Sequence, residues 1–309
     1  MLGRYKVDLK RCTRRTCLVY KEGMPEEATI QNNGGHVVVE TAYDRNLEGL
    51  PGVEISAETK RCYKIFRNKR IYLPGDLDRA VAETLKGHDV LRIAMNGYSQ
   101  LSSEHCATWG VRPGAYEQAV ASLLEAVTRR VQHIFNGIDV RFLHGSSNMG
   151  VDASIMQVAK KMNRPNLGFS CPSFMFYVED DDSPVYVAAN QAAYADAFAK
   201  STDILIACNG RAQALQHDLM AALLYGKEVV LVNVLRTIST TGGPSAIGPD
   251  GKIEDAVDAF LIRVHAVGQR LENGGNYDHW SRTVNEIMDV AAGICRQRLS
   301  PERAFQIVA

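Results

Sequence analysis

An alternation of short apolar runs with amphipathic segments, between residues 88 and 235, constrains the fold most strongly. Apolar runs of four to six residues bounded by turn residues are typical of buried parallel strands, and the intervening segments have helical spacing. Alternating strands and helices predict an α/β fold, a Rossmann-like parallel sheet with right-handed crossovers. The predicted strands are Val90–Met95, Val140–Leu143, Asn166–Ser170, Asp203–Cys208 and Val229–Val234, and the predicted helices include Pro113–Phe135, Val151–Met162, Asn190–Ala199 and a segment from Arg211 to Tyr225.

The first 87 residues have a different pattern. Short β-type runs, His36–Thr41 and Cys62–Phe66, lie between turn residues, and a helix from Asp76 to Lys86 follows them. We expect residues 1–87 to form a small β-rich subdomain and residues 88–309 to form the Rossmann-like domain.

The end of the chain continues that domain beyond the last predicted strand. The segment Thr237–Gly251 is rich in Gly, Ser, Thr and Pro and predicts a loop at the edge of the sheet. Two further helices are expected, at Ile253–Leu271 and Trp280–Gln297.

Composition gives no support for a nucleic-acid-binding, membrane-spanning or secreted protein. Lys plus Arg and Asp plus Glu number 35 each, which gives no support for a broad nucleic-acid surface. No apolar run approaches a membrane span, and the charged N-terminus lacks a signal-peptide core. Seven scattered cysteines favour reduced thiols in a cytoplasmic protein. Cys12 and Cys17 have no second ligand pair, so no metal is expected.

The loop after the second predicted strand, His144–Gly150, is the strongest candidate site. Gly145 and Gly150 permit close backbone approach, and the following helix offers N–H groups and a partial positive charge that suit a phosphate. Ser146 and Ser147 add hydroxyl donors. The alternative is a plain strand-to-helix turn with cap residues. The loop has neither the P-loop ending nor the dinucleotide fingerprint.

Two other strand ends carry residues suited to a ligand. Gly97 and Ser99 follow the first strand, where Tyr98 is either a stacking partner for a base or part of a tight turn. Asn209 and Gly210 follow the fourth strand, at the same edge of the sheet.

A helix after the fourth strand begins with Arg211 and carries Asp218. Arg211 suits a phosphate or carboxylate, and Asp218 lies two helical turns further on the same face. A carboxylate there can bind ribose hydroxyls or stabilise an oxocarbenium-like centre. The alternative is an exposed acid of the first turn or an internal ion pair.

The order of these segments resembles the SLOG superfamily, which includes phosphoribohydrolases that release the base from nucleoside monophosphates, and nucleotide-sensing domains. The segment Asp203–Asp218, with Gly226 and Lys227, also looks like the nucleoside deoxyribosyltransferases. The resemblance implies a nucleotide-binding fold, no metal or redox cofactor, and a homodimer or larger assembly. It departs at one place: the hydrolases' Pro-Gly-Gly-x-Gly-Thr-x-x-Glu signature is absent, and Asp218 stands for the glutamate.

Two classes of function follow from these residues. In the first, the chain is a nucleotide or nucleoside N-glycosidase or a base transferase, in which Asp218 faces the ribose and Arg211 helps to hold a phosphate. In the second, it binds a nucleotide-derived small molecule without cleaving it, as the missing signature suggests. A structural or assembly protein that lost the pocket is a third reading. No membrane and no nucleic acid are expected as partners.

Overall fold

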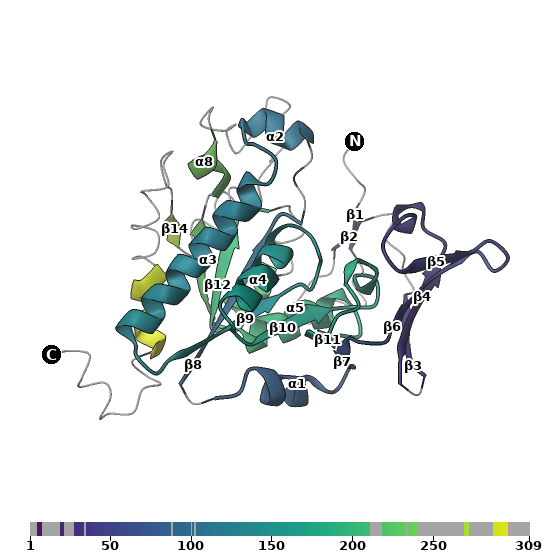
Figure 1. Cartoon of the computed structure of the whole chain (residues 1–309), viewed down its shortest axis with the longest axis horizontal. Helices are drawn as coiled ribbons and strands as arrows, with labels where there is room; N and C mark the ends of the chain where they lie inside the picture. The colour runs from purple at the N-terminus through teal and green to yellow at the C-terminus, as the bar shows by residue number, and fades with distance from the viewer. Residues whose placement is uncertain are drawn as a thin grey trace.

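The structure is a computed structural model whose centre is an eight-stranded sheet with helices on both faces (Figure 1). It describes residues 5–7, 19–21, 28–33, 35–87, 89–99, 101, 103–210, 218–232, 234–239, 269–271 and 287–295. Every neighbouring pair of strands in this sheet is parallel. In spatial order its strands are β14 (Gln269–Leu271), β13 (Glu228–Val232), β12 (Ile204–Cys208), β8 (Val90–Gly97), β9 (Asp139–His144), β10 (Asn166–Ser170), β11 (Pro184–Val187) and β7 (Arg70–Tyr72).

The chain reverses its direction of growth across the sheet beside β8. From β8 it adds β9, β10 and β11 on one side, and it then returns to place β12 and β13 on the other. In parallel sheets, ligands bind beyond the carboxyl ends of the strands at such a reversal. A ligand-binding site is therefore expected at the carboxyl ends of β8, β9 and β12.

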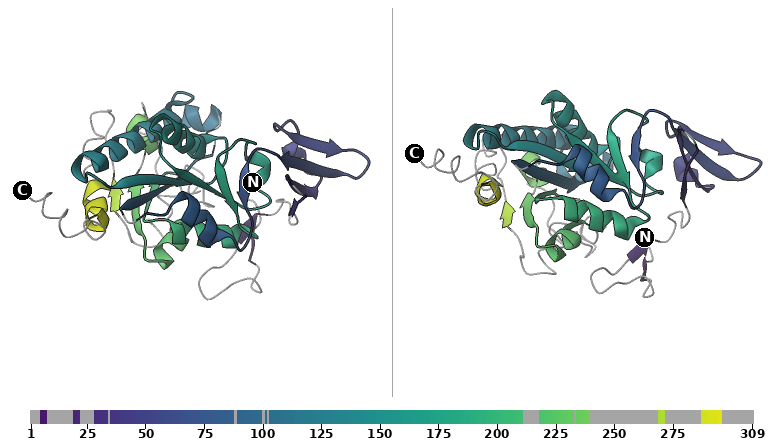
Figure 2. Two further views of the ribbon diagram at one scale, coloured as in Figure 1. Left: turned by 60° about the horizontal axis from the view of Figure 1, so that its bottom comes forward. Right: turned by 90° about the horizontal axis from the view of Figure 1, so that it is seen from below.

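Two helical layers cover the sheet, as the two views in Figure 2 show. One layer contains α3 (Ala115–Ile134), α4 (Gly150–Lys161) and helical residues 287–295, and the other contains α1 (Leu77–Thr84), α5 (Gln191–Ser201) and α7 (Met220–Leu224). The short helices α2 (Ser103–Trp109) and α8 (Val234–Ile238) belong to the first side.

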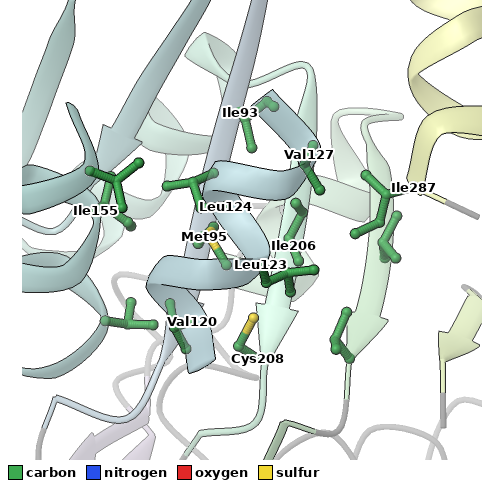
Figure 3. Packing of buried hydrophobic residues seen from close by; sticks show 14 of the residues in the cluster. Ile93, Met95, Val120, Leu123, Leu124, Val127, Ile155, Ile206, Cys208 and Ile287 are labelled. Carbon is green, nitrogen blue, oxygen red and sulfur yellow. The ribbon is translucent and has the colours of Figure 1, made fainter. Parts of the chain in front are cut away.

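The packing of α3 follows directly from its sequence. Ala119, Leu123, Val127 and Val131 recur at helical spacing and are fully buried against the sheet. Figure 3 shows Leu123 and Val127 packed with Ile93 of β8 and Ile206 of β12. Burial of this stripe fixes the helix over the two strands at which the chain reverses.

A smaller antiparallel sheet precedes the parallel one. Its strands lie in the order β3 (Thr29–Asn32), β4 (Val37–Ala42), β6 (Arg61–Phe66) and β5 (Val53–Ser56), with the 3-10 turn η1 (Arg45–Leu47) between β4 and β5. A separate antiparallel pair joins β1 (Tyr5–Val7) to β2 (Val19–Lys21). Figure 1 shows the four-stranded sheet at one end of the molecule.

The small sheet packs on the segment between β10 and β11. Val39 and Phe66 join a core with Phe176, from the 3-10 turn η2 (Met175–Tyr177), and with Val185. The ammonium group of Lys64 is buried there and donates to the carbonyl oxygen of Phe176 at 2.9 Å, and burial lowers the pKa of Lys64 to about 8.

Asp180 closes this junction. Its carboxylate accepts the backbone N–H groups of three successive residues, Arg67, Asn68 and Lys69, at distances between 2.8 and 3.1 Å. These bonds tie the end of β6 and the start of β7 to the loop before β11.

The structure confirms the α/β fold with a parallel sheet and a β-rich N-terminal part. Each of the five predicted strands is present, and the helices at Pro113–Phe135, Val151–Met162 and Asn190–Ala199 are confirmed to within two residues at each end. Asp76–Lys86 is confirmed as the shorter α1.

Several elements differ from the sequence predictions. Strands β7 and β11 were not predicted, and both join the large sheet. Since β7 precedes α1, the segment 70–84 lies in the parallel sheet and its helical layer, although it falls within the predicted N-terminal subdomain. Gln269–Leu271, at the end of a predicted helix, forms β14, and Val234–Ile238 forms a helix where a strand end and a loop were expected.

Within the described part of the chain, no helix combines the length and apolarity required to cross a bilayer.

Asp180→Ala should lower the free energy of unfolding by about 1–3 kcal/mol, because three backbone donors lose their acceptor. The change is measured by urea denaturation. Asp182→Ala, an exposed acid two residues further along the same loop, is the matched control and should change stability by less than about 0.5 kcal/mol. Equal stability of the two variants would contradict the assigned role of Asp180.

Candidate functional site

A pocket lies at the carboxyl ends of β8 and β9, at the point where the chain reverses. It holds about 370 Å³ of empty space, part of it open to solvent. The residues that line it share a location at strand ends, at the start of α4, on α5 or just before α7; they are Met95, Asn96, Gly97, Tyr98, Ser99, Gly145, Val151, Asp152, Tyr194, Phe198 and Asp218.

Asp218 places a buried carboxyl group in this pocket. Its side chain lies just before α7, and its Oδ1 has no hydrogen-bond partner among the described residues. The pKa of Asp218 is raised to about 7, mainly by burial; the Asn96 amide partly opposes the rise and the nearby charge of Asp152 adds to it. A carboxyl group that changes charge near neutral pH suits acid–base or electrostatic catalysis.

Asn96 adds a second unpartnered polar group. It lies near the end of β8 and is 6% exposed, and among the described residues neither its Nδ2 nor its Oδ1 has a partner at full hydrogen-bond geometry, although its amide is near enough to the Asp218 carboxyl to lower the pKa of that group. Buried amides are normally satisfied, because an unmade hydrogen bond costs about 1–3 kcal/mol. Two such groups in one pocket, Asn96 and Asp218, indicate a polar ligand.

Asp152 shapes the wall formed by the loop after β9. This residue of the first turn of α4 accepts the N–H of Gly145 at 2.7 Å and the N–H of Ser147 at 3.2 Å. A Cβ at position 145 would lie 2.7 Å from Oδ2 of Asp152, so the close approach requires glycine. Burial raises the pKa of Asp152 to about 6, although the two backbone donors oppose the rise.

Aromatic rings from α5 form another wall. Tyr194 and Phe198 are nearly parallel, with ring centroids 5.9 Å apart. Burial raises the pKa of the Tyr194 phenol well above its usual value, and the charges of Asp218 and Asp152 add to the rise. Tyr194 therefore remains a neutral group beside the two carboxyls, and the rings offer an apolar surface to a ligand.

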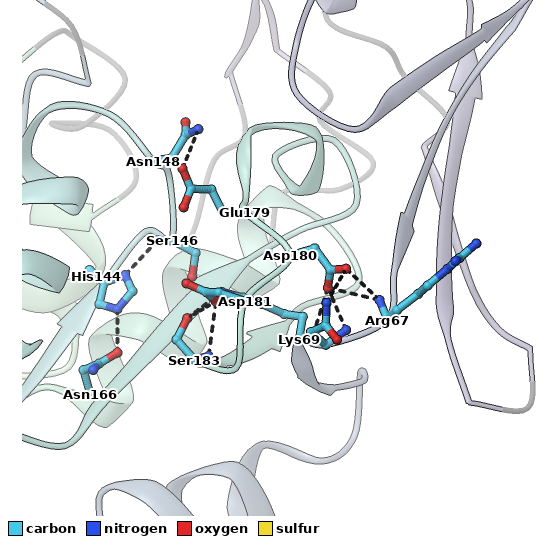
Figure 4. A network of polar contacts seen from close by, with 11 residues as sticks. Arg67, Lys69, His144, Ser146, Asn148, Asn166, Glu179, Asp180, Asp181 and Ser183 are labelled. Carbon is cyan, nitrogen blue, oxygen red and sulfur yellow. Dashed lines mark hydrogen bonds and ion pairs between the residues drawn. The ribbon is translucent and has the colours of Figure 1, made fainter.

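His144, at the end of β9, supports the loop from behind. Its Nδ1 accepts the N–H of Ser146 at 3.1 Å, and its Nε2 lies 3.1 Å from Oδ1 of Asn166 (Figure 4). Burial lowers the pKa of His144 to about 4, so the ring is neutral and Nε2 carries the proton. Ser146 adopts the left-handed conformation (φ 62°), and its hydroxyl lies over Gly168, where a Cβ would come within 1.7 Å of it.

Five of the residues singled out from the sequence line the pocket: Gly97, Tyr98, Ser99, Gly145 and Asp218. Gly97 is required there because a Cβ would lie 2.2 Å from the Tyr116 hydroxyl. Tyr98 borders the pocket, but its ring is buried and meets Tyr116 edge-on, so it is not presented for stacking on a base.

The other predicted site residues are placed differently. Ser146, Ser147 and Gly150 belong to the loop but do not line the pocket, and Gly150 allows the β8 loop to cross the start of α4. Asn209 and Gly210 also lie outside the lining; Asn209 Oδ1 accepts the N–H of Leu235 at 2.9 Å. Arg211 lies outside the described residues, and the phosphate-binding role of this whole set remains a prediction.

Six lining residues were not predicted as site residues: Met95, Asn96, Val151, Asp152, Tyr194 and Phe198. Asp152 had one local signal, an acid in the first turn of a helix that follows a glycine-containing loop. Tyr194 and Phe198 had none, since their spacing on α5 is that of core residues.

No group of three or more His, Cys, Asp or Glu side chains suited to a metal occurs among the residues with described side chains. Cys12 and Cys17 lie outside this set.

Asp218→Asn should stabilise the fold, and more at pH 8 than at pH 5. The folded-state pKa, about 7, lies above the ordinary value of 3.8, so the carboxyl binds its proton more tightly in the folded state. Stability is therefore lost as the pH rises from about 4 to about 7, and the neutral amide avoids that loss. The gain should be roughly 1–3 kcal/mol larger at pH 8 than at pH 5, measured by denaturation at both values.

The exposed acid Asp78, in the first turn of α1, provides the control for this comparison. Asp78→Asn should change stability equally at the two pH values. A gain for Asp218→Asn that does not depend on pH would show that the carboxyl is not charged at a cost in the folded protein.

Comparison with known proteins finds likeness only at low identity. No protein-family model matches the chain, and no curated protein matches it. Among solved structures, the chain is similar to the molybdenum cofactor carrier protein of Chlamydomonas reinhardtii, with 17% identity, a TM-score of 0.42, and coverage of 65% of this chain and 98% of that one. It is also similar to the molybdenum cofactor binding protein of Rippkaea orientalis, with 15% identity, a TM-score of 0.40, and coverage of 64% and 96%.

Proposed function

We propose that this chain binds a nucleoside or nucleotide-derived ligand in the pocket and cleaves its N-glycosidic bond, or transfers its base. The observation that carries the proposal is the buried carboxyl of Asp218, whose Oδ1 has no hydrogen-bond partner among the described residues, in a pocket at the carboxyl ends of the strands. The unpartnered amide of Asn96 beside it supports a ligand rich in hydrogen-bonding groups.

The proposed reaction breaks the bond between C1′ of the sugar and a nitrogen of the base. The bonding electron pair leaves with the base, and positive charge develops at C1′ and the ring oxygen. Ionised Asp218 stabilises that charge, and its partly desolvated position strengthens the interaction. Water then adds at C1′ and supplies the proton that the released base requires; in a transfer reaction, a second base adds instead.

The walls of the pocket have distinct tasks in this proposal. Asn96 and Ser99 hydrogen-bond sugar hydroxyls, and the rings of Tyr194 and Phe198 pack on an apolar face of the ligand. Asp152 keeps the Gly145–Ser147 loop in place, and its charge adds to the rise in the pKa of Asp218 that burial causes.

Asp218→Asn should abolish base release, with a loss of at least about 100-fold, while the protein still folds. Nucleosides, nucleoside mono-, di- and triphosphates and NAD are incubated with the protein, with and without an acceptor base, and free base is measured by mass spectrometry. Asp78→Asn is the control and should retain full activity. An active Asp218→Asn variant would contradict the role of this residue, and recovery of every ligand intact would instead favour a binding module that does not cleave.

The rate of base release should rise with pH through about 7, because Asp218 acts in its ionised form. In Asp152→Asn, the inflection should move to lower pH, since the neighbouring negative charge that raises the pKa of Asp218 is gone. The measurement is kcat/KM from pH 5 to pH 9 for both proteins. An unchanged inflection in Asp152→Asn would show that the two carboxyls do not titrate together.

A further inference from the structure

Four successive backbone amides of the glycine-containing loop, Gly145 to Asn148, are already engaged within the protein. Gly145 and Ser147 donate to the Asp152 carboxylate at 2.7 and 3.2 Å. Ser146 donates to Nδ1 of His144, and Asn148 donates to the carbonyl oxygen of Tyr177 at 3.2 Å. A phosphate cradle needs free N–H groups that converge on one point, and these donors are directed to partners of the chain itself.

One first-turn amide of α4, that of Val151, is also bound by the neighbouring loop. Val151 donates its N–H to the carbonyl oxygen of Tyr98 at 3.1 Å. Gly150 has a positive φ of 54°, and a Cβ there would lie 2.2 Å from the same oxygen. The carbonyl groups of Tyr98 and Ser99 thus cover the amide that an anion at this helix terminus would use.

The charge of the pocket also disfavours the binding of a phosphate. Its described lining contains two carboxyl groups, Asp152 and Asp218, and no Lys, Arg or His. A phosphate placed against the Gly145–Ser147 loop would meet the Asp152 carboxylate that already occupies these donors. Like charges at contact distance cost several kcal/mol when they are partly desolvated.

An uncharged, hydroxyl-rich group satisfies the same pocket. Ionised carboxylates accept hydrogen bonds from sugar hydroxyls, and the Asn96 amide both donates and accepts. Tyr194 and Phe198 supply the apolar contact that a base or a sugar face requires. None of these described lining side chains carries a positive charge that an anionic ligand would neutralise.

We propose that Asp152 is a specificity-determining residue that excludes phosphate from the Gly145–Gly150 loop, so that the pocket takes unphosphorylated nucleosides in preference to nucleotides. The inference deepens the proposed function, on which it rests for the class of ligand. The sequence of the Gly145–Gly150 loop suggests that it binds phosphate, whereas in this proposal the loop excludes phosphate.

The test is isothermal calorimetry with adenosine, guanosine, cytidine and uridine, each paired with its 5′-monophosphate, at fixed ionic strength. For the nucleosides that the wild-type chain binds, the monophosphate should bind about tenfold or more weakly. In Asp152→Asn, which removes the charge and frees one loop donor, that ratio should fall about tenfold. Asp78→Asn, the same chemical change in the first turn of α1, should leave the ratio unchanged.

The wild-type comparison stands even if Asp152→Asn fails to fold. Equal or tighter binding of the monophosphates to wild type would overturn the proposal, as would the absence of binding by every nucleoside. An unchanged ratio of nucleoside to monophosphate affinity in a folded Asp152→Asn variant would show that Asp152 does not determine this specificity. Preferential binding of nucleosides without base release would support the specificity inference and contradict the N-glycosidase proposal. Base release from monophosphates alone would support the N-glycosidase proposal and contradict the specificity inference.

Discussion

The contact between Asp152 and the loop after β9 is the interaction on which the geometry of the pocket depends. One carboxylate accepts the N–H groups of Gly145 and Ser147 and folds the loop back on the helix that follows it. Burial is the main cause of the raised pKa of Asp218, and the charge of Asp152 adds to it, so one side chain shapes the wall and also influences the protonation of its neighbour. A substitution at position 152 therefore cannot change either property alone.

The unpartnered groups Asn96 and Asp218 cost folding free energy that the surrounding packing must offset. Asn96 lies near the end of β8, between β9 and β12, and Asp218 lies in the segment just before α7 that faces the same pocket. The fully buried stripe of α3 covers these strands on one face and contributes the apolar burial that compensates. Unsatisfied polar groups persist only where such packing holds them, which is the usual arrangement of a functional site.

Sequence reasoning succeeded where the signal is local and periodic, as in the helical spacing of Ala119 to Val131 or the apolar run of β12. It missed β11, a four-residue strand that follows the acidic stretch Glu179–Asp182, because a short run gives too few residues to establish a period. In the site, Asp218 and Gly145 follow strand ends and were found. Tyr194 and Asp152 were not, since α5 and α4 bring them into the pocket through tertiary packing.

The N-terminal sheet connects to the site through the segment Met175–Ser183. On one side, the ammonium group of Lys64 donates to the carbonyl oxygen of Phe176. The backbone amides of Arg67–Lys69 donate to the carboxylate of Asp180. On the other, the backbone N–H of Asn148 donates to the carbonyl oxygen of Tyr177 at 3.2 Å, and its side-chain amide makes a longer, exposed contact of 3.4 Å with Glu179. Asp152 thus holds the loop at its inner end and the N-terminal sheet restrains it at its outer end, so the geometry of the pocket wall depends on both parts of the chain.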